Sequence, residues 1–140
     1  MTWLIYAFLS AFFAALTAIL AKIGVKDINS NLATGIRTIV IMLFAWGIIF
    51  FQGLFKDIPK ISRFGLFFLV LSGLATGLSW LFYFRALQIG SVSKVVPIDK
   101  LSLVLTIILS VLILKEKLTF PVLIGVLLMT AGAIIIGFWK

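Results

Sequence analysis

Five long apolar stretches fill most of this chain and restrict what it can fold into. They cover residues 3–21, 32–51, 64–84, 95–114 and 120–139. A helix needs about 20 mostly apolar residues to cross the hydrocarbon core of a bilayer. Each stretch is continuously apolar rather than alternating, which favours helices over the strands of a membrane barrel. The pattern therefore predicts an all-α, polytopic membrane protein with five transmembrane helices.

The composition supports this class and argues against several functions. Of 140 residues, 64% are hydrophobic and 11% are charged, whereas about a quarter are charged in a soluble domain. Cysteine and histidine do not occur, which removes thiolate chemistry and the commonest metal ligand. With four carboxylates in the chain, we expect no enzymatic activity, catalytic residue, metal or cofactor. The first apolar run starts at Trp3 with no basic segment before it, so we expect a retained span rather than a signal peptide.

The net charge of +8 comes from lysines and arginines that sit singly between the apolar runs. Such spacing is typical of loops that face anionic headgroups, so we expect membrane lipid as a partner and no nucleic acid. The N-terminal side carries five basic residues, Lys56, Lys60, Arg63, Lys115 and Lys117, and the other side also carries five, Lys22, Lys26, Arg85, Lys94 and Lys140.

Arg37 and Lys100, inside spans near the second side, change the balance to five against seven. Orientation follows an excess of positive charge in cytoplasmic loops, and here that excess is small or absent. We therefore predict insertion in both orientations. A fixed orientation, with the second side in the cytoplasm, is the alternative.

Three segments in the second half of the chain carry a family resemblance. Residues 84–90 (FRALQIG), 112–119 (LILKEKLT) and 124–132 (IGVLLMTAG) resemble the third, fourth and fifth helices of EamA-type transporters in the drug/metabolite transporter superfamily. Residues 95–102 (VVPIDKLS) resemble a short, single-unit subgroup. The resemblance covers residues 1–140 as one five-helix domain.

Many relatives contain two such units in opposite orientation, so the resemblance implies half of an inverted-repeat fold and an antiparallel homodimer. The chain lacks the first-helix glutamate of the small multidrug-resistance family, so that proton-coupling residue has no counterpart here.

Ionisable residues inside a membrane are costly and are functional candidates by default. At helical spacing, Asp99 shares a face with Ser102, Thr106 and Ser110, which suggests a water-accessible path and a carboxyl group that exchanges protons. In the alternative, a helix that begins at Pro97 has Asp99 in its first turn, where an acid is favoured. The hydroxyl groups can also bond to their own backbone.

Two basic residues complete the charged candidates. Lys100 points away from the polar face, where it either snorkels to the headgroups or pairs structurally, or contacts substrate. Arg37 lies six residues past Asn31, about 9 Å along a helix. It can reach the membrane interface, or it can pair with Asp99 as a gate.

Aromatic residues cluster near the end of the third stretch. Trp80 and Tyr83 fit an interfacial aromatic belt. They also fit the wall of a transport path, where cation–π contact would hold a solute.

These features predict a secondary transporter in the cell membrane. We expect a multi-pass exporter of a small organic solute or metabolite, which works by alternating access between two oppositely oriented units. Two alternatives remain open: a flippase subunit for a lipid or carrier lipid, and an accessory membrane protein that transports nothing itself.

Overall fold

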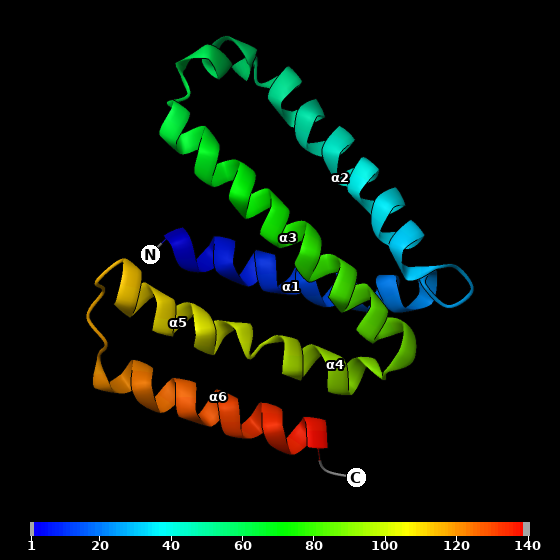
Figure 1. The fold of residues 1–140 in the computed structure, drawn as a ribbon, viewed down its shortest axis with the longest axis vertical. Helices are drawn as coiled ribbons and strands as arrows, with labels where there is room; N and C mark the ends of the chain where they lie inside the picture. The colour runs from blue at the N-terminus through cyan, green and yellow to red at the C-terminus, as the bar shows by residue number, and fades with distance from the viewer. Residues whose placement is uncertain (1, 139–140) are drawn as a thin grey trace. The chain divides into compact units, whose positions relative to one another are not determined.

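The computed structural model describes residues 2–138, and the long elements in this range are all helices (Figure 1). Four spans are single helices: α1 (Thr2–Gly24), α2 (Ser30–Phe51), α3 (Arg63–Ile89) and α6 (Phe120–Phe138). The remaining span, Val92–Ile113, consists of α4 (Val92–Asp99) and α5 (Ser102–Ile113). These five segments are long and apolar enough to cross a membrane, so the predicted fold class is confirmed. Positions 139 and 140, which belong to the last predicted span and the charge count, lie outside the described residues.

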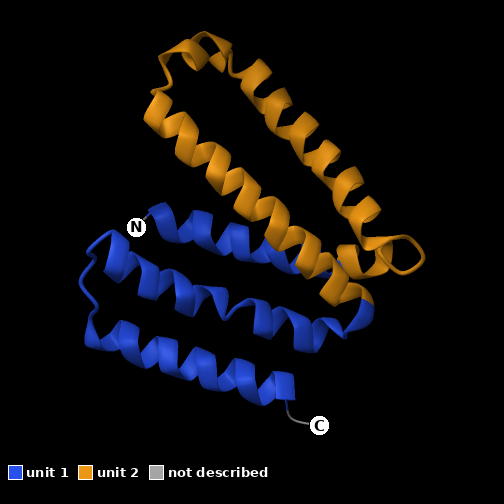
Figure 2. Cartoon of the chain, viewed as in Figure 1, with its two compact units in different colours: residues 1–19, 89–140 blue, residues 20–88 orange. Residues whose placement is uncertain are grey.

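The chain divides into two compact units (Figure 2). Unit 2 is continuous, spans Leu20–Gln88, and contains the last turn of α1, all of α2, and most of α3. Unit 1 combines Met1–Ile19 with Ile89–Lys140, and so contains most of α1 together with α4, α5 and α6.

Local sequence signals position the ends of α2 in unit 2. Asn29 caps the first turn, because its Oδ1 accepts a hydrogen bond from the backbone N–H of Asn31 at 2.9 Å, as a residue of this type does at an N-cap. After α2, Gly53 adopts φ +67°, a left-handed conformation that suits glycine. A 3₁₀ helix, η1 (Leu54–Lys60), then leads to α3.

The core of unit 2 lies where α1, α2 and α3 meet. Val25, Ala33 and Phe84 are buried against one another, and Ala21 and Tyr83 pack around them. Val25 follows the end of α1, Ala33 lies in the first turns of α2, and Phe84 lies near the end of α3. This cluster fixes one end of α2 against one end of α3.

In unit 1, α4 and α6 approach closely at a glycine. A Cβ atom at Gly137 would lie 2.5 Å from Cδ1 of Ile98, closer than two carbon atoms pack. The glycine therefore allows α4 and α6 to come together next to the end of α4.

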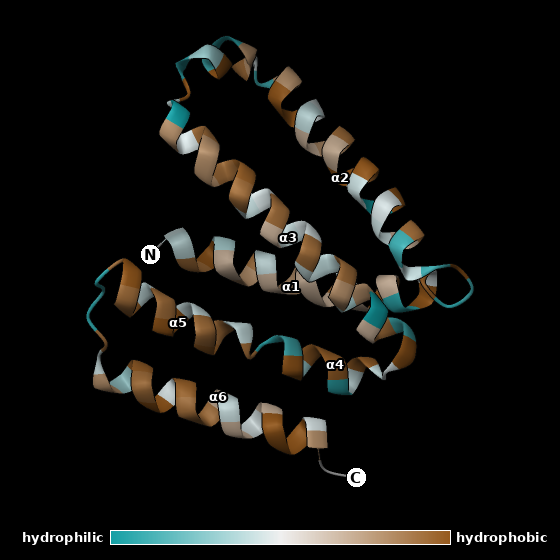
Figure 3. Cartoon of the chain, in the orientation of Figure 1, coloured by the Kyte–Doolittle hydropathy of each residue, from teal (hydrophilic) through white to brown (hydrophobic). Residues whose placement is uncertain are grey.

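Most large apolar side chains are exposed, and hydrophobic residues, brown in Figure 3, recur along every long helix. Phe12 on α1, Leu43 on α2 and Phe68 on α3 are each more than half exposed. In a bilayer this surface contacts acyl chains, which are as apolar as the side chains themselves. The surface and the five long helices together identify a multi-pass membrane protein.

The fourth span is interrupted at Lys100 and Leu101, and this differs from the sequence-based expectation. Helix α4 begins at Val92 rather than at Pro97, so Asp99 is its last residue and does not lie in a first turn. Beyond it the backbone tightens: Leu101 N bonds to Ile98 O and Leu103 N to Lys100 O, both at 3.0 Å. These i to i+3 bonds are of the 3₁₀ type.

Candidate functional site

Arg37 lies on the inward face of α2. Its helical neighbours three, four and seven residues earlier are Thr34, Ala33 and Ser30, and all three are buried. Arg37 itself is half-buried. A side chain on this face points towards α3, so the structure favours an inward arginine over one that snorkels to the headgroups.

Two aromatic rings of α3 hold the Arg37 guanidinium. Its Cζ lies 4.3 Å from the centroid of the Trp80 ring and 5.3 Å from that of Phe84. Both distances are within the range of a cation–π interaction. Trp80 and Phe84 are four residues apart and therefore share a face of the helix. Together these two rings and Arg37 form what we call the arginine–aromatic cluster.

The cluster differs in one member from the predicted aromatic wall. Trp80 contacts the charge, as a path residue would, but its partner ring is Phe84 rather than Tyr83. Tyr83 packs beside the core of unit 2, and its ring meets that of Phe84 edge to face at 6.3 Å between centroids. The i to i+4 spacing of Trp80 and Phe84 was the sequence signal that could have identified the pair.

A hydrogen-bond network joins the end of α3 to the loop after α1. Gln88 donates through Nε2 to the carbonyl oxygens of Val25 at 3.1 Å and Ile28 at 2.8 Å. Its Oε1 accepts from Nη1 of Arg85 at 2.8 Å. Lys22 donates through Nζ to the carbonyl of Leu87, where a cation offsets the negative end of the helix dipole. Sequence reasoning did not single out Gln88.

Asp99 and Lys100 meet at the break in the fourth span. Oδ2 of Asp99 lies 3.7 Å from Nζ of Lys100, with the lysine side chain half exposed. A structural pair, one of the alternatives for Lys100, is present, and its contact with substrate stays a prediction. Because Arg37 belongs to unit 2 and Asp99 to unit 1, a pair between these two stays a prediction.

The expected stripe of hydroxyl groups falls on the second half of the broken span. Thr106 donates through Oγ1 to the carbonyl of Ser102 at 2.8 Å, and Ser110 donates to that of Ile107 at 2.9 Å. These bonds within the helix match the backbone-bonding alternative. The break separates Asp99 from Ser102, so the stripe does not follow one continuous helix.

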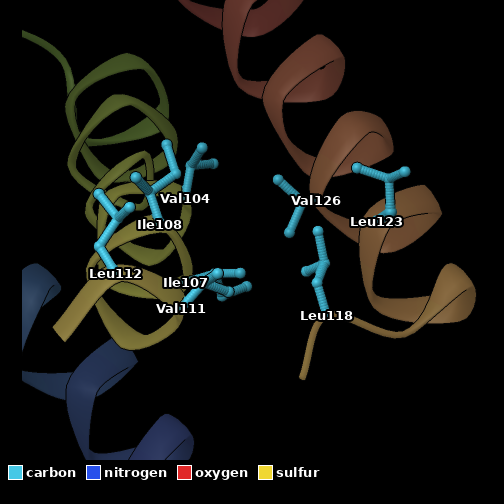
Figure 4. A pocket seen from close by; sticks show the side chains of 8 residues that line it. All are labelled: Val104, Ile107, Ile108, Val111, Leu112, Leu118, Leu123 and Val126. Carbon is cyan, nitrogen blue, oxygen red and sulfur yellow. The ribbon is translucent and has the colours of Figure 1, made fainter. Parts of the chain in front are cut away.

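Two pockets differ sharply in chemistry, and neither contains a predicted path residue. In unit 1 a space of about 330 Å³ lies between α5 and α6, where aliphatic side chains face one another (Figure 4). In unit 2 a space of about 500 Å³ is lined by Lys22, Ile23, Val25, Lys26 and Gln88. The first suits an apolar group, and the second offers lysines beside a hydrogen-bonding amide.

Comparison with known families decides the assignment. The model of the EamA-like transporter family matches residues 1–138. The chain belongs to the EamA-like transporter family. It is thus a membrane transporter by family, and members of this family are generally not enzymes.

This EamA-like transporter has curated relatives in a bacterium and an archaeon. It is 48% identical over 136 residues to a Sinorhizobium protein named "Uncharacterized transporter in cobO 3'region", with 97% of this chain and 96% of that one covered. An uncharacterized protein of Methanocaldococcus jannaschii is 32% identical over 83 residues, which cover 59% of this chain and 61% of that protein. No solved structure gives a significant match.

The site of this EamA-like transporter thus has two parts. The arginine–aromatic cluster lies in unit 2, and the Asp99–Lys100 pair lies at the break in unit 1. Both place charge within segments long and apolar enough to span a membrane. Charge at such depth is costly and usually serves a function.

Proposed function

We propose that the protein is a secondary transporter that exports a small organic solute or metabolite across the cell membrane. The observation that carries the proposal is the interrupted fourth span with a charged pair at its break. Secondary transporters commonly build substrate and ion sites from discontinuous helices near the bilayer midplane. At this break the charged side chains of Asp99 and Lys100 are the groups that can bind or release the solute.

The proposed path takes residues from each of the two units. Arg37, Trp80 and Tyr83 line it from α2 and α3, and Asp99, Lys100, Ser102 and Thr106 line it from the broken span. Asp99 exchanges protons with the substrate in this scheme, because it is the carboxylate at the break. The Asp99–Lys100 pair opens when the solute arrives and closes when it leaves.

Alternating access requires a second unit in the opposite orientation. Inverted repeats provide it in many transporters by rocking of one repeat against the other. A five-span chain with nearly balanced charges can supply this partner as a second copy inserted the other way up. We therefore propose an antiparallel homodimer with dual topology.

A flippase subunit for a lipid or carrier lipid is the second candidate. It is favoured by the pocket that Lys22, Lys26 and Gln88 line at the end of unit 2. Basic pockets beside transmembrane helices bind headgroup phosphates. A flippase would lose activity when Lys26 is neutralised, whereas the proposed solute transporter would not.

The functional test is transport by the purified chain alone in proteoliposomes. A panel of labelled amino acids, organic acids and amines is followed with and without a proton gradient. We expect at least one solute to move, and we expect Asp99→Asn to abolish the response to the gradient. Rates equal to those of empty liposomes for every solute would favour the accessory-protein alternative.

The dimer has its own test. A C-terminal reporter that is active on one side of the membrane is fused to the chain, and a second reporter reads the other side. Dual topology gives signal from both reporters in comparable amounts. Signal from one reporter alone would overturn the antiparallel homodimer and leave transport to be judged by the liposome assay.

A further inference from the structure

The guanidinium of Arg37 lies over two rings, and it makes no hydrogen bond to an oxygen of the described residues of its own unit. The Tyr83 hydroxyl group interacts with its charge electrostatically. Among the described residues of unit 2, no backbone or side-chain oxygen accepts a hydrogen bond from Arg37, and no carboxylate pairs with it. Asp57 pairs with Lys60 at 2.5 Å in η1. Cation–π contact stabilises the charge but leaves the five N–H donors of a guanidinium without acceptors.

The donors of Arg37 also remain accessible. No buried side-chain nitrogen or oxygen among the described residues lacks a hydrogen-bond partner. Since the Arg37 nitrogens have no such partner within unit 2, they keep a surface that another group can reach. An arginine with its charge over a ring and its N–H groups free is preorganised for a planar oxyanion.

We infer that Arg37 is the binding site for an oxyanion of the transported solute, a carboxylate or a phosphate group. This inference rests on the proposed transport function and names the chemical class of its substrate. Arginine binds both groups with two parallel hydrogen bonds, which are stronger than neutral ones. The Trp80 and Phe84 rings fix the guanidinium in place, and the half-buried Trp80 ring offers an apolar surface for the rest of the solute.

An amine fits this site poorly. A cationic solute would have to displace Arg37 from the Trp80 and Phe84 rings, and the arginine would then lie inside the membrane segment with neither rings nor an oxyanion. An anion instead adds the acceptors that the cluster lacks and leaves the cation–π contacts intact. The charge of the solute is therefore the property that the cluster selects.

The experiment compares ring-matched probes of different charge. The purified protein, in nanodiscs of phosphatidylcholine, is heated with benzoate, phenyl phosphate, benzamide or benzylamine at millimolar concentration, and its Tm is read. A ligand that binds the folded state raises Tm. We expect benzoate or phenyl phosphate to raise Tm by a few degrees, and the amide and amine to leave it unchanged.

Variants assign the shift to Arg37. Arg37→Gln should weaken anion binding by about 30-fold or more, as loss of one partner of a buried charge pair does. Arg37→Lys keeps the charge without the planar fork, so it provides a folded variant in which binding is also weaker. Lys26→Gln changes a basic residue outside the cluster and should leave the shift intact.

Several results would overturn the inference. They are an equal shift with benzylamine, a shift retained in both Arg37 variants, and no shift with either anion.

A shift produced only when phosphatidylglycerol is added to the nanodisc, and lost in Arg37→Gln, would assign the oxyanion to a lipid headgroup. Failure of all solutes to cross liposomes, with anion binding preserved, would reject the transport function but keep the site.

Discussion

The Cζ atom of Arg37 lies 4.3 Å from the centroid of the Trp80 ring, between two helices that are each long and apolar enough to span a membrane. Arg37 is seven residues into α2, about 10 Å from its start. Its charge therefore lies over a ring of the neighbouring helix, within the length of the span.

Arg37 and Trp80 should be energetically coupled. In a double-mutant cycle with Arg37→Gln and Trp80→Leu, we expect a coupling energy of about 0.5–2 kcal/mol, the size of a partly desolvated cation–π contact. The measurement is reversible unfolding in detergent micelles. Trp46→Leu is the matched control, because Trp46 stacks on Phe55 at 5.7 Å between centroids. Equal coupling of Arg37 to both tryptophans would contradict the assigned contact.

Gln88 should hold the loop after α1 against the end of α3. Gln88→Leu leaves the carbonyl oxygens of Val25 and Ile28 without their donor, and we expect a loss of about 1–3 kcal/mol in stability. Hydrogen exchange of residues 25–31 should rise with it. Gln52→Leu is the control, since Gln52 is exposed and caps the end of α2 through its backbone N–H. Unchanged hydrogen exchange of residues 25–31 in the Gln88→Leu variant would contradict the proposed role of these hydrogen bonds.

Asp99 and Lys100 should depend on each other. Neutralising one leaves the other charge unpaired within a membrane span, where a lone charge costs about 2.5–3.5 kcal/mol on insertion scales. We expect Asp99→Asn and Lys100→Gln to reduce the folded yield singly. The double variant should recover much of that yield, as read by size-exclusion chromatography. Additive losses in the double variant would mean that the pair is not formed in the membrane.

Gly137 should tolerate alanine less well than Gly132. Alanine favours a helix interior over glycine by about 0.8–1 kcal/mol, and a Cβ at Gly132 meets nothing within 4 Å. Gly132→Ala should therefore raise thermal stability. At Gly137 the same Cβ meets Ile98, which offsets the gain, and adding Ile98→Ala should restore it. Equal Tm changes at both glycines would contradict the close packing of α4 and α6.

The fold class and the five spans could be predicted from the sequence, because a run of about 20 apolar residues rarely forms anything other than a transmembrane helix. The sequence also located the charged residues of the spans. It did not locate the break at Lys100, since Asp99 and Lys100 read equally well as the start of a helix. Pro97 was the available signal, because it removes one hydrogen bond from the turn before the break.

The partners of Arg37 depended on tertiary structure. Helical spacing can place Trp80 and Phe84 on one face, but it cannot select which of the neighbouring helices presents a charge to them. The same limit applies to Gln88, whose bonds reach back about 60 residues along the chain to Ile28. Contacts between distant segments come from packing and have no local pattern.

The most direct test of the account is the reactivity of position 37 in the intact membrane. The chain contains no cysteine, so Arg37→Cys and Ile36→Cys each introduce a single thiol. Ile36 is adjacent in sequence and 51% exposed on the apolar surface. If Arg37 lines a water-accessible path, a membrane-impermeant charged thiosulfonate should label the Arg37→Cys variant readily and the Ile36→Cys variant slowly. Equal labelling of both, or faster labelling at position 36, would contradict the path.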